Sequence, residues 1–175
     1  MKPPPNGFVS NRVLKLNVGF LLSHGLGLSR EVAFDVPDLA VSDDLHLAYL
    51  KGTLRISHTS EGILIQGELN TAIKGECRRC LTPMDIPLTV RLQELFTIHP
   101  NPTAEFVVGE DAIIDLTPLV REEIIIATPI APVCSPDCAG LCPQCGHNLN
   151  EGPCECELDD IDPRFAILQQ LRKQE

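Results

Sequence analysis

Aromatic residues are scarce in this chain. It has no Trp, one Tyr and six Phe, so aromatics make up 4% of its 175 residues. Proteins that bind single strands of nucleic acid commonly stack the bases on several aromatic side chains. The composition therefore argues against an extended stacking surface. It also requires Leu, Ile and Val to build the core, because hydrophobic residues still account for 43% of the chain.

Long hydrophobic runs are also lacking. No stretch approaches the roughly eighteen apolar residues that a membrane-spanning helix needs. The apolar segment VGFLLS near the N-terminus is confined by Lys15, Asn17 and His24, and no small-residue cleavage site follows it. We therefore expect a cytoplasmic protein that does not contact a membrane.

Positive charge is in short supply as well. The chain has 14 Lys and Arg against 24 Asp and Glu, which gives a formal net charge of −10. Such a surface repels phosphate backbones, so any direct contact with RNA would have to be local, and a protein partner is easier to accommodate. The candidates for such a local contact are Lys74, Arg78, Arg79, Arg91, Arg172 and Lys173.

The length suits one domain with a small appendage. We expect a flexible Pro-rich N-terminus (1–11), a β-rich domain with a packing helix (12–130), and a Cys-rich zinc loop with a C-terminal helix (131–175). In GILIQGELNTAIKGEC, apolar and polar residues alternate up to Cys77, which predicts a strand with one buried face. Similar runs at 47–57 and 86–96 extend it to an antiparallel meander of at least three strands.

Two helices are predicted after the meander. In DLTPLVREEIIIATP, Asp115 is the expected N-cap, Pro118 lies in the tolerant first turn and Pro129 ends the helix. A second helix is expected from Asp162 onward, with Pro163 at its first position. The apolar face of the first comprises Leu116, Leu119, Val120, Ile124 and Ala127, and that of the second comprises Phe165, Leu168 and Leu171. The fold class is thus α+β, a partly open, barrel-like antiparallel sheet packed by one or two helices.

Six of the eight cysteines lie in CSPDCAGLCPQCGHNLNEGPCEC, between residues 134 and 156. In a reducing compartment such clusters are typical of metal ligands rather than disulfides. Cys142 and Cys145 in LCPQCGHN have the spacing at which two thiolates reach one ion, and Gly146 permits the positive φ that follows. Their partners are either Cys134 with Cys138 or Cys154 with Cys156, and either pair completes a four-thiolate Zn(II) site.

A four-thiolate site is usually structural, because it leaves no open position for water. The loop has few apolar residues of its own, so we expect it to need the metal to fold. One structural zinc site is expected, and the alternative is a second site that Cys77 and Cys80 complete with the C-terminal cysteines. Otherwise Cys77 is a small buried side chain and Cys80 a turn residue. His147 beside Cys145 is a further candidate ligand.

Other cysteine chemistries fit less well. Cys138, Cys142 and Cys145 have the spacing of a radical-enzyme iron–sulfur motif, but the chain is too short for the barrel of such enzymes. No His is followed two residues later by Glu, as zinc deaminases require. Cys77 and Cys80 in CRRC could act as a redox pair, yet no helix follows them to lower a thiolate pKa. With no phosphate loop or nucleophile elbow, we expect no enzyme and no small-molecule substrate.

The motifs ECRRCL, IDLTPLVREEIIIATPIAPVC, DCAGLCPQCGHNLN and DPRFAIL, in this order, resemble the YceD family of large ribosomal RNA subunit accumulation proteins. The resemblance runs from about residue 12 to residue 172. It implies a role in the synthesis, processing or accumulation of large-subunit (23S) ribosomal RNA, with no enzymatic activity. The functional candidates that it implies are Cys77, Cys80, Asp115, Glu122 and the cysteines from Cys134 to Cys156.

The family includes members that lack much of the C-terminal cysteine cluster. The resemblance therefore implies that CRRC, its sheet and its packing helix form the shared functional surface. We expect an accessory factor that binds a ribosomal protein, an assembly factor or an rRNA-processing enzyme, with Arg78 and Arg79 giving at most a local phosphate contact. The alternative is a redox switch in which oxidation of the cysteines ejects zinc.

Overall fold

The structure is a computed structural model that describes residues 12–99 and 104–156. These residues form two compact units. The first, the sheet unit, comprises residues 12–76, 83–99 and 104–132; the second, the Cys-rich unit, comprises residues 77–82 and 133–156. The predicted flexible N-terminus and the predicted helix from Asp162 lie outside the described residues. None of the described helices is long and apolar enough to cross a bilayer.

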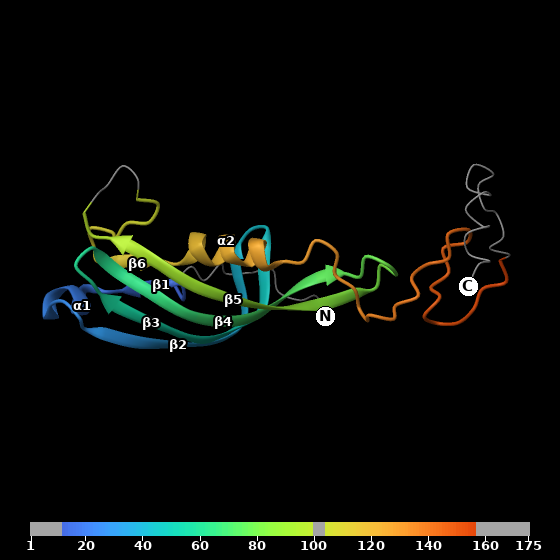
Figure 1. The fold of residues 1–175 in the computed structure, drawn as a ribbon, viewed down its shortest axis with the longest axis horizontal. Coiled ribbons are helices and arrows are strands. Elements are labelled where there is room, and N and C mark those ends of the chain that lie inside the picture. The colour runs from blue at the N-terminus through green and yellow to red at the C-terminus, as the bar shows by residue number, and fades with distance from the viewer. Residues whose placement is uncertain (1–11, 100–103, 157–175) are drawn as a thin grey trace, which may run out of the picture. The chain divides into compact units, whose positions relative to one another are not determined.

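The main sheet of the first unit is a four-stranded antiparallel meander (Figure 1). Its strands are β2 (Ser29–Ser42), β3 (Leu45–His58), β4 (Gly62–Glu76) and β5 (Pro83–Thr97), and they lie side by side in chain order. The predicted α+β class is confirmed. The sequence patterns predicted at least three strands, and β2 is the additional one.

One face of β4 is buried, as its alternation predicts. Ile63, Ile65 and Leu69 are fully buried, whereas Glu68 and Asn70 on either side of Leu69 are exposed. β4 pairs with β5 along its whole length, from Gly62 opposite Thr97 to Glu76 opposite Pro83. The strand therefore reaches the turn at Cys77 in a fixed register, which positions the first of the candidate site residues.

A short helix and a second sheet flank one end of the meander. β1 (Lys15–Asn17) pairs antiparallel with β6 (Ile113–Asp115), and α1 (Gly19–His24) follows β1 directly. The sequence patterns did not predict α1. His58 at the end of β3 secures this helix, because its Nδ1 lies 3.1 Å from the carbonyl oxygen of Leu21 and 3.0 Å from that of Gly25.

The predicted packing helix is α2 (Thr117–Ala127), and its apolar face is buried as expected through Leu119, Val120 and Ile124. The prediction that Asp115 is its N-cap is wrong by one residue, because Asp115 belongs to β6 and the N-cap is Leu116. Asp115 still supports the helix start, since its Oδ1 accepts a hydrogen bond of 2.9 Å from the Thr117 N–H. Pro118 lies in the first turn, and Thr128 before Pro129 is extended, which ends the helix.

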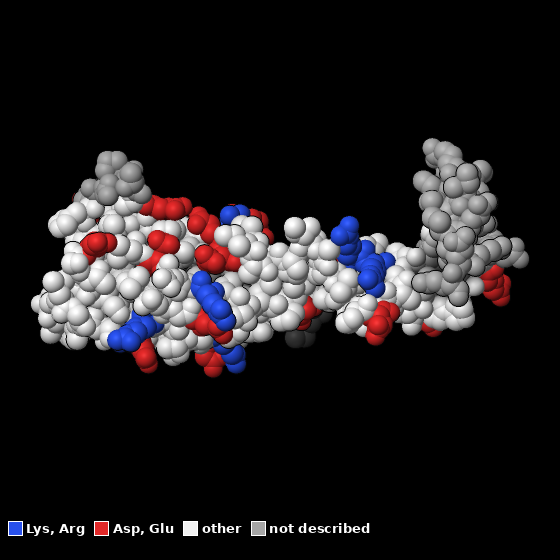
Figure 2. All heavy atoms as spheres, viewed as in Figure 1, with Lys and Arg blue, Asp and Glu red and all other residues white. Residues whose placement is uncertain are grey.

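α2 packs on β5 and β2, the two edge strands of the meander (Figure 1). One helix can contact both edge strands only if the sheet curls around it. The sheet and α2 therefore enclose one hydrophobic core. Arg121 on α2 also holds the turn between β2 and β3, where its Nη2 lies 2.7 Å from Asp44 Oδ2. On the face of the molecule drawn in Figure 2, the Lys and Arg side chains of the described residues are interspersed with Asp and Glu side chains.

Candidate metal centres

The turn between β4 and β5 is the first half of a metal-binding arrangement. Cys77 follows β4, and the turn runs through Cys80 to Thr82 before β5 begins. Two backbone hydrogen bonds close it: the Cys77 N–H donates to Thr82 O over 2.9 Å, and the Leu81 N–H donates to Cys77 O over 2.9 Å. Leu81 adopts the left-handed conformation with φ of 58°, which lets the chain reverse immediately after Cys80.

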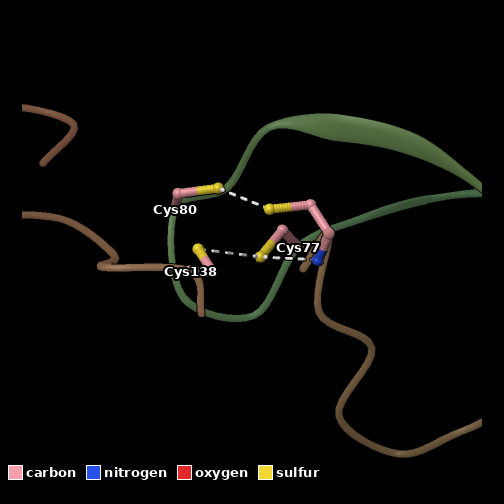
Figure 3. Close-up of side chains that lie close together, drawn as sticks. Cys77, Cys80 and Cys138 are labelled. Atoms are coloured by element: carbon pink, nitrogen blue, oxygen red, sulfur yellow. Dashed lines mark hydrogen bonds between the residues drawn. The ribbon is translucent and has the colours of Figure 1, made fainter. Parts of the chain in front are cut away.

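The first four-cysteine cluster joins this turn to residues 134–138. Its members are Cys77, Cys80, Cys134 and Cys138, whose sulfur atoms all lie within 4.8 Å of one another. Sγ of Cys77 is 3.8 Å from that of Cys138, and Sγ of Cys80 is 3.7 Å from that of Cys134. Figure 3 shows the sulfur atoms of Cys77, Cys80 and Cys138 facing a common centre. All but Cys134 are buried.

These distances suit ligation of an ion. All eight cysteines lie in the described residues, and each is a free thiol. Four sulfur ligands arranged tetrahedrally at about 2.3 Å from a zinc ion lie about 3.8 Å apart. The sulfur–sulfur distances of 3.7 and 3.8 Å in the first cluster therefore match the edges of such a tetrahedron. The first cluster could hold one metal ion.

The second four-cysteine cluster comprises Cys142, Cys145, Cys154 and Cys156, whose sulfur atoms also lie within 4.8 Å of one another. Its turn repeats the hydrogen bonds of the first. The Cys142 N–H donates to His147 O over 2.8 Å, and the Gly146 N–H donates to Cys142 O over 2.9 Å. Gly146 has the positive φ that the sequence predicts, at 73°. Only Cys142 in this cluster is buried.

Several hydrogen bonds hold the loop around the first cluster. Arg79 donates from Nη1 to the carbonyl oxygens of Pro136, at 3.1 Å, and Cys138, at 3.0 Å. Asn150 donates from Nδ2 to the sulfur of Cys138 over 3.4 Å, and the Cys134 N–H donates to the sulfur of Cys77 over 3.3 Å. Such contacts orient the sulfur ligands and stabilise their thiolate form.

Backbone donors favour one thiolate in each cluster. The N–H of Cys80, and then that of Cys134, lower the pKa of Cys77 to about 6. The N–H of Cys145, and then that of Gln144, lower the pKa of Cys142 to about 6 in the same way. The two turns therefore present equivalent thiolates at their first cysteines.

Neighbouring sulfur atoms oppose ionisation of a second cysteine in each cluster. The sulfur of Cys138 is the largest influence that raises the pKa of Cys134 to about 12. The sulfur of Cys145 has the same effect on Cys156, whose pKa also rises to about 12. Four thiolates this close together repel one another unless a cation lies among them, so both clusters have the chemistry of a metal site.

The predicted ligands fall into two groups. Cys142 and Cys145 lie with Cys154 and Cys156, one of the two pairings that the spacing left open, while Cys134 and Cys138 join Cys77 and Cys80. There are thus two clusters, where one site was expected and two were the alternative. His147 contributes its carbonyl oxygen to the second turn and belongs to neither cluster.

The other predicted residues have separate positions. Arg79 braces the loop, whereas Arg78 is exposed and makes no side-chain hydrogen bond or ion pair within the described part of the chain. Asp115 ends β6 and Glu122 is exposed on α2, so both belong to the sheet unit. The pairing of Cys77 with Cys138 could not be read from spacing, because 60 residues and the whole of β5 and α2 separate the two cysteines.

The comparisons with known proteins agree with the motifs. The model of a family described as "Large ribosomal RNA subunit accumulation protein YceD" matches residues 65–172. The Mycobacterium tuberculosis protein Rv2926c is 37% identical over 131 residues, which are 71% of this chain and 62% of the relative. Bacillus subtilis YlbN is 33% identical over 118 residues, which are 63% of this chain and 69% of the relative.

An Arabidopsis thaliana protein named "Large ribosomal RNA subunit accumulation protein YCED homolog 1, chloroplastic" is 33% identical over 61 residues, 35% of this chain and 19% of its own length. The chain spans 57–62% of the length of the mycobacterial relatives that it matches. No solved structure matches it. Because the family model covers more than half of the sequence, the chain belongs to the YceD family of large ribosomal RNA subunit accumulation proteins.

Proposed function

We propose that this protein is a non-enzymatic accessory factor in ribosome biogenesis that supports accumulation of large-subunit (23S) ribosomal RNA through protein–protein contacts. The observation that carries this proposal is the division of eight cysteines into two sets of four in a chain of this family. Each set would give one ion a complete shell of protein ligands. Such closed sites stabilise folds rather than activate water.

The metal in both clusters is Zn(II) under this proposal. Four thiolates in a tetrahedral arrangement select zinc or iron, and zinc is the redox-inactive choice for a structural site. One bound zinc with four thiolates carries a net charge of about −2, so both sites add to the acidic character of the chain. The first zinc ion would tie residues 134–138 to the turn that follows β4, and the second would hold residues 142–156 together.

The partner is a ribosomal protein, an assembly factor or an rRNA-processing enzyme in the cytoplasm. A net charge of −10 favours a basic partner, and ribosomal proteins are basic because they bind RNA. Arg78 is the candidate for a local contact beside the first cluster, since its side chain is exposed and Arg79 is engaged by the loop.

Complementation in cells depleted of the protein tests this function. The levels of mature large-subunit rRNA and of free large subunits would be measured by gel and sucrose gradient. We expect Cys77→Ser and Arg78→Glu to lower both severalfold, and Lys51→Glu, a control at the exposed pair with Asp35, to leave them unchanged. Normal rRNA in depleted cells would refute the proposal. Arg79→Glu is less informative because it also breaks the contacts with Pro136 and Cys138.

A second candidate function is a thiol redox switch. The observation that favours it is the accessibility of the second cluster, where Cys145 is exposed and Cys154 and Cys156 are half-buried. Oxidation there would release zinc and unfold the loop. This function predicts that wild-type cells lose large subunits only after exposure to oxidant. In Cys145→Ser cells, the level of large subunits should be the same with and without oxidant.

A further inference from the structure

A cavity in the sheet unit lies apart from the cysteines. It has a volume of about 250 Å³ and lies where β1 and α1 meet β2 and β3. Its apolar lining comes from Leu16, Leu21, Val32 and Ile56, of which Leu21 and Ile56 are buried. Lys15, Asn17, Phe20 and Arg30 complete the lining. The cavity therefore combines an apolar floor with two cations and an aromatic ring.

Phe20 is unusual for this chain. It is one of only seven Phe and Tyr residues, yet it is 54% exposed. Its ring lies 4.0 Å from that of His24, centroid to centroid, at an interplanar angle of 35°. α1 is held in place by His58, whose Nδ1 contacts the carbonyl oxygens of Leu21 and Gly25. Phe20 thus offers an exposed ring on an anchored helix, as a base-stacking site requires.

The cations of the cavity are available to a ligand. Arg30 is exposed and has no ion pair or side-chain hydrogen bond within the described residues. Lys15 has one long contact, at 3.7 Å, with Asp115 Oδ2, and an ammonium group has further N–H donors to offer. Asn17 uses its Oδ1 to accept the Gly19 N–H, and its amide nitrogen makes no hydrogen bond within the described residues.

The charge distribution along the sequence supports an anionic ligand here. All 24 acidic residues lie at position 31 or later, so the first thirty residues contain Lys and Arg but no Asp or Glu. Lys15, Phe20 and Arg30 all come from this acid-free stretch, in a chain whose net charge is −10. A local positive field at this cavity is therefore compatible with an acidic molecule as a whole.

We propose that this cavity binds a nucleotide of single-stranded RNA, with the base against Phe20 and the apolar floor and a phosphate at Arg30 and Lys15. Exposed aromatic rings beside free cations are the combination with which proteins hold unpaired nucleotides. An acidic peptide would use the cations but leave the ring and the apolar floor unfilled. The proposal goes beyond the accessory role and gives it a direct RNA contact, since that role requires only a protein partner.

Fluorescence anisotropy with a labelled single-stranded ten-nucleotide RNA tests the site, on the full chain purified with its metal under reducing conditions. We expect Phe20→Ala to weaken binding about five- to 150-fold. Arg30→Ala should weaken it too and reduce the slope of log affinity against log salt by about 0.7. Lys51→Ala is the charge-matched control, because Lys51 pairs with Asp35 across β3 and β2 and does not line the cavity. Phe20→Trp should retain binding.

The outcomes are distinguishable. Loss of binding with Phe20→Ala and Arg30→Ala, but not with Lys51→Ala, supports the site. Equal binding by the wild type, Phe20→Ala and Arg30→Ala would overturn it, as would no RNA binding by the wild type. Displacement of the labelled RNA by a poly-glutamate peptide as effectively as by unlabelled RNA would overturn it too. Competition by free AMP as strong as by the oligonucleotide would show a mononucleotide pocket and would overturn the RNA assignment. A failure of this site would leave the rRNA phenotype of Cys77→Ser intact, so the two proposals fail separately.

Discussion

The two Cys-x-x-Cys turns, residues 77–82 and 142–147, share one backbone design and differ in what surrounds it. In both, the N–H of the first cysteine donates to the carbonyl five residues later, and its own carbonyl accepts the N–H four residues later. In both, backbone N–H groups lower the pKa of the first cysteine to about 6. The ligand geometry is thus a property of the turn itself, independent of the neighbouring sequence.

The surroundings decide how much each turn depends on metal. The first turn connects β4 and β5, which are paired along their whole length, and three of its four cluster members are buried. The second turn is supported by loop contacts such as the bridge between Leu141 and Asn148, and one of its cluster members is buried. We infer that the hairpin preforms the first site, whereas the second site and its loop form only together with the ion.

The largest expected difference is in local order after loss of one ligand. Cys142→Ser should abolish hydrogen-exchange protection in residues 139–156, because a structural zinc site supplies on the order of 10 kcal/mol of folding free energy. Cys77→Ser should abolish hydrogen-exchange protection in residues 133–138 but leave β4 and β5 protected. Exchange measured by mass spectrometry tests both, with His147→Ala as a control that keeps both sites. Loss of protection in β4 with Cys77→Ser would contradict the account of a preformed hairpin.

A smaller expected difference is in metal affinity, when the residue after the second cysteine of each turn is replaced. Leu81 and Gly146 both have positive φ, at 58° and 73°, which costs a non-glycine residue roughly 1–2 kcal/mol. Gly146→Leu should therefore weaken metal binding at the second cluster about tenfold. Leu81→Gly should leave the first cluster as tight or tighter, because Leu81 is 57% exposed and loses little packing. Chelator competition measures the metal affinity of both clusters. If the two substitutions weakened metal binding equally, the positive φ would not have the same role in the two turns.

The smallest expected effect is confined to the sheet unit. The hydrogen bond from Arg121 is the main cause that lowers the pKa of Asp44 from 3.8 to about 2, so the folded state favours the ionised carboxylate. This stabilisation is complete above about pH 4 and is lost as the pH falls through about 2. Asp44→Asn should therefore lower the urea midpoint of the sheet unit slightly at pH 7, with the difference from wild type vanishing toward pH 2. Asp35→Asn, at the more exposed pair with Lys51, is the control and should have no measurable effect.

The sequence predicts the elements with strong periodicity and misses those defined by long-range contacts. The alternation from Ile63 to Cys77 identifies β4, and the spacing of Leu119, Val120 and Ile124 identifies the packing face of α2. α1 escapes prediction because six residues carry too little helical pattern. The cluster that joins Cys77 to Cys138 depends on the sheet, which no local pattern encodes.

The likeness between the two turns is a signal that sequence reading could have used. CRRCLT and CPQCGH have the same cysteine spacing. Gly146 indicates the left-handed conformation in the second turn, whereas the equivalent residue in the first turn is Leu81, which gives no such signal. Two such turns among eight cysteines indicate two sites of four ligands. No sequence pattern indicated the cavity beside Phe20. Lys15 and Arg30 belong to different strands, and they line one cavity only because the fold brings β1 near β2.

The zinc content of protein purified under reducing conditions shows whether both clusters hold an ion. It is measured by native mass spectrometry for the wild type, Cys77→Ser and Cys142→Ser. We expect two zinc ions per wild-type chain and one in each variant, with the remaining ion at the intact cluster. One zinc in the wild type that is lost with Cys142→Ser and retained with Cys77→Ser would rule out two metal sites, because the first cluster would then be four thiols without an ion.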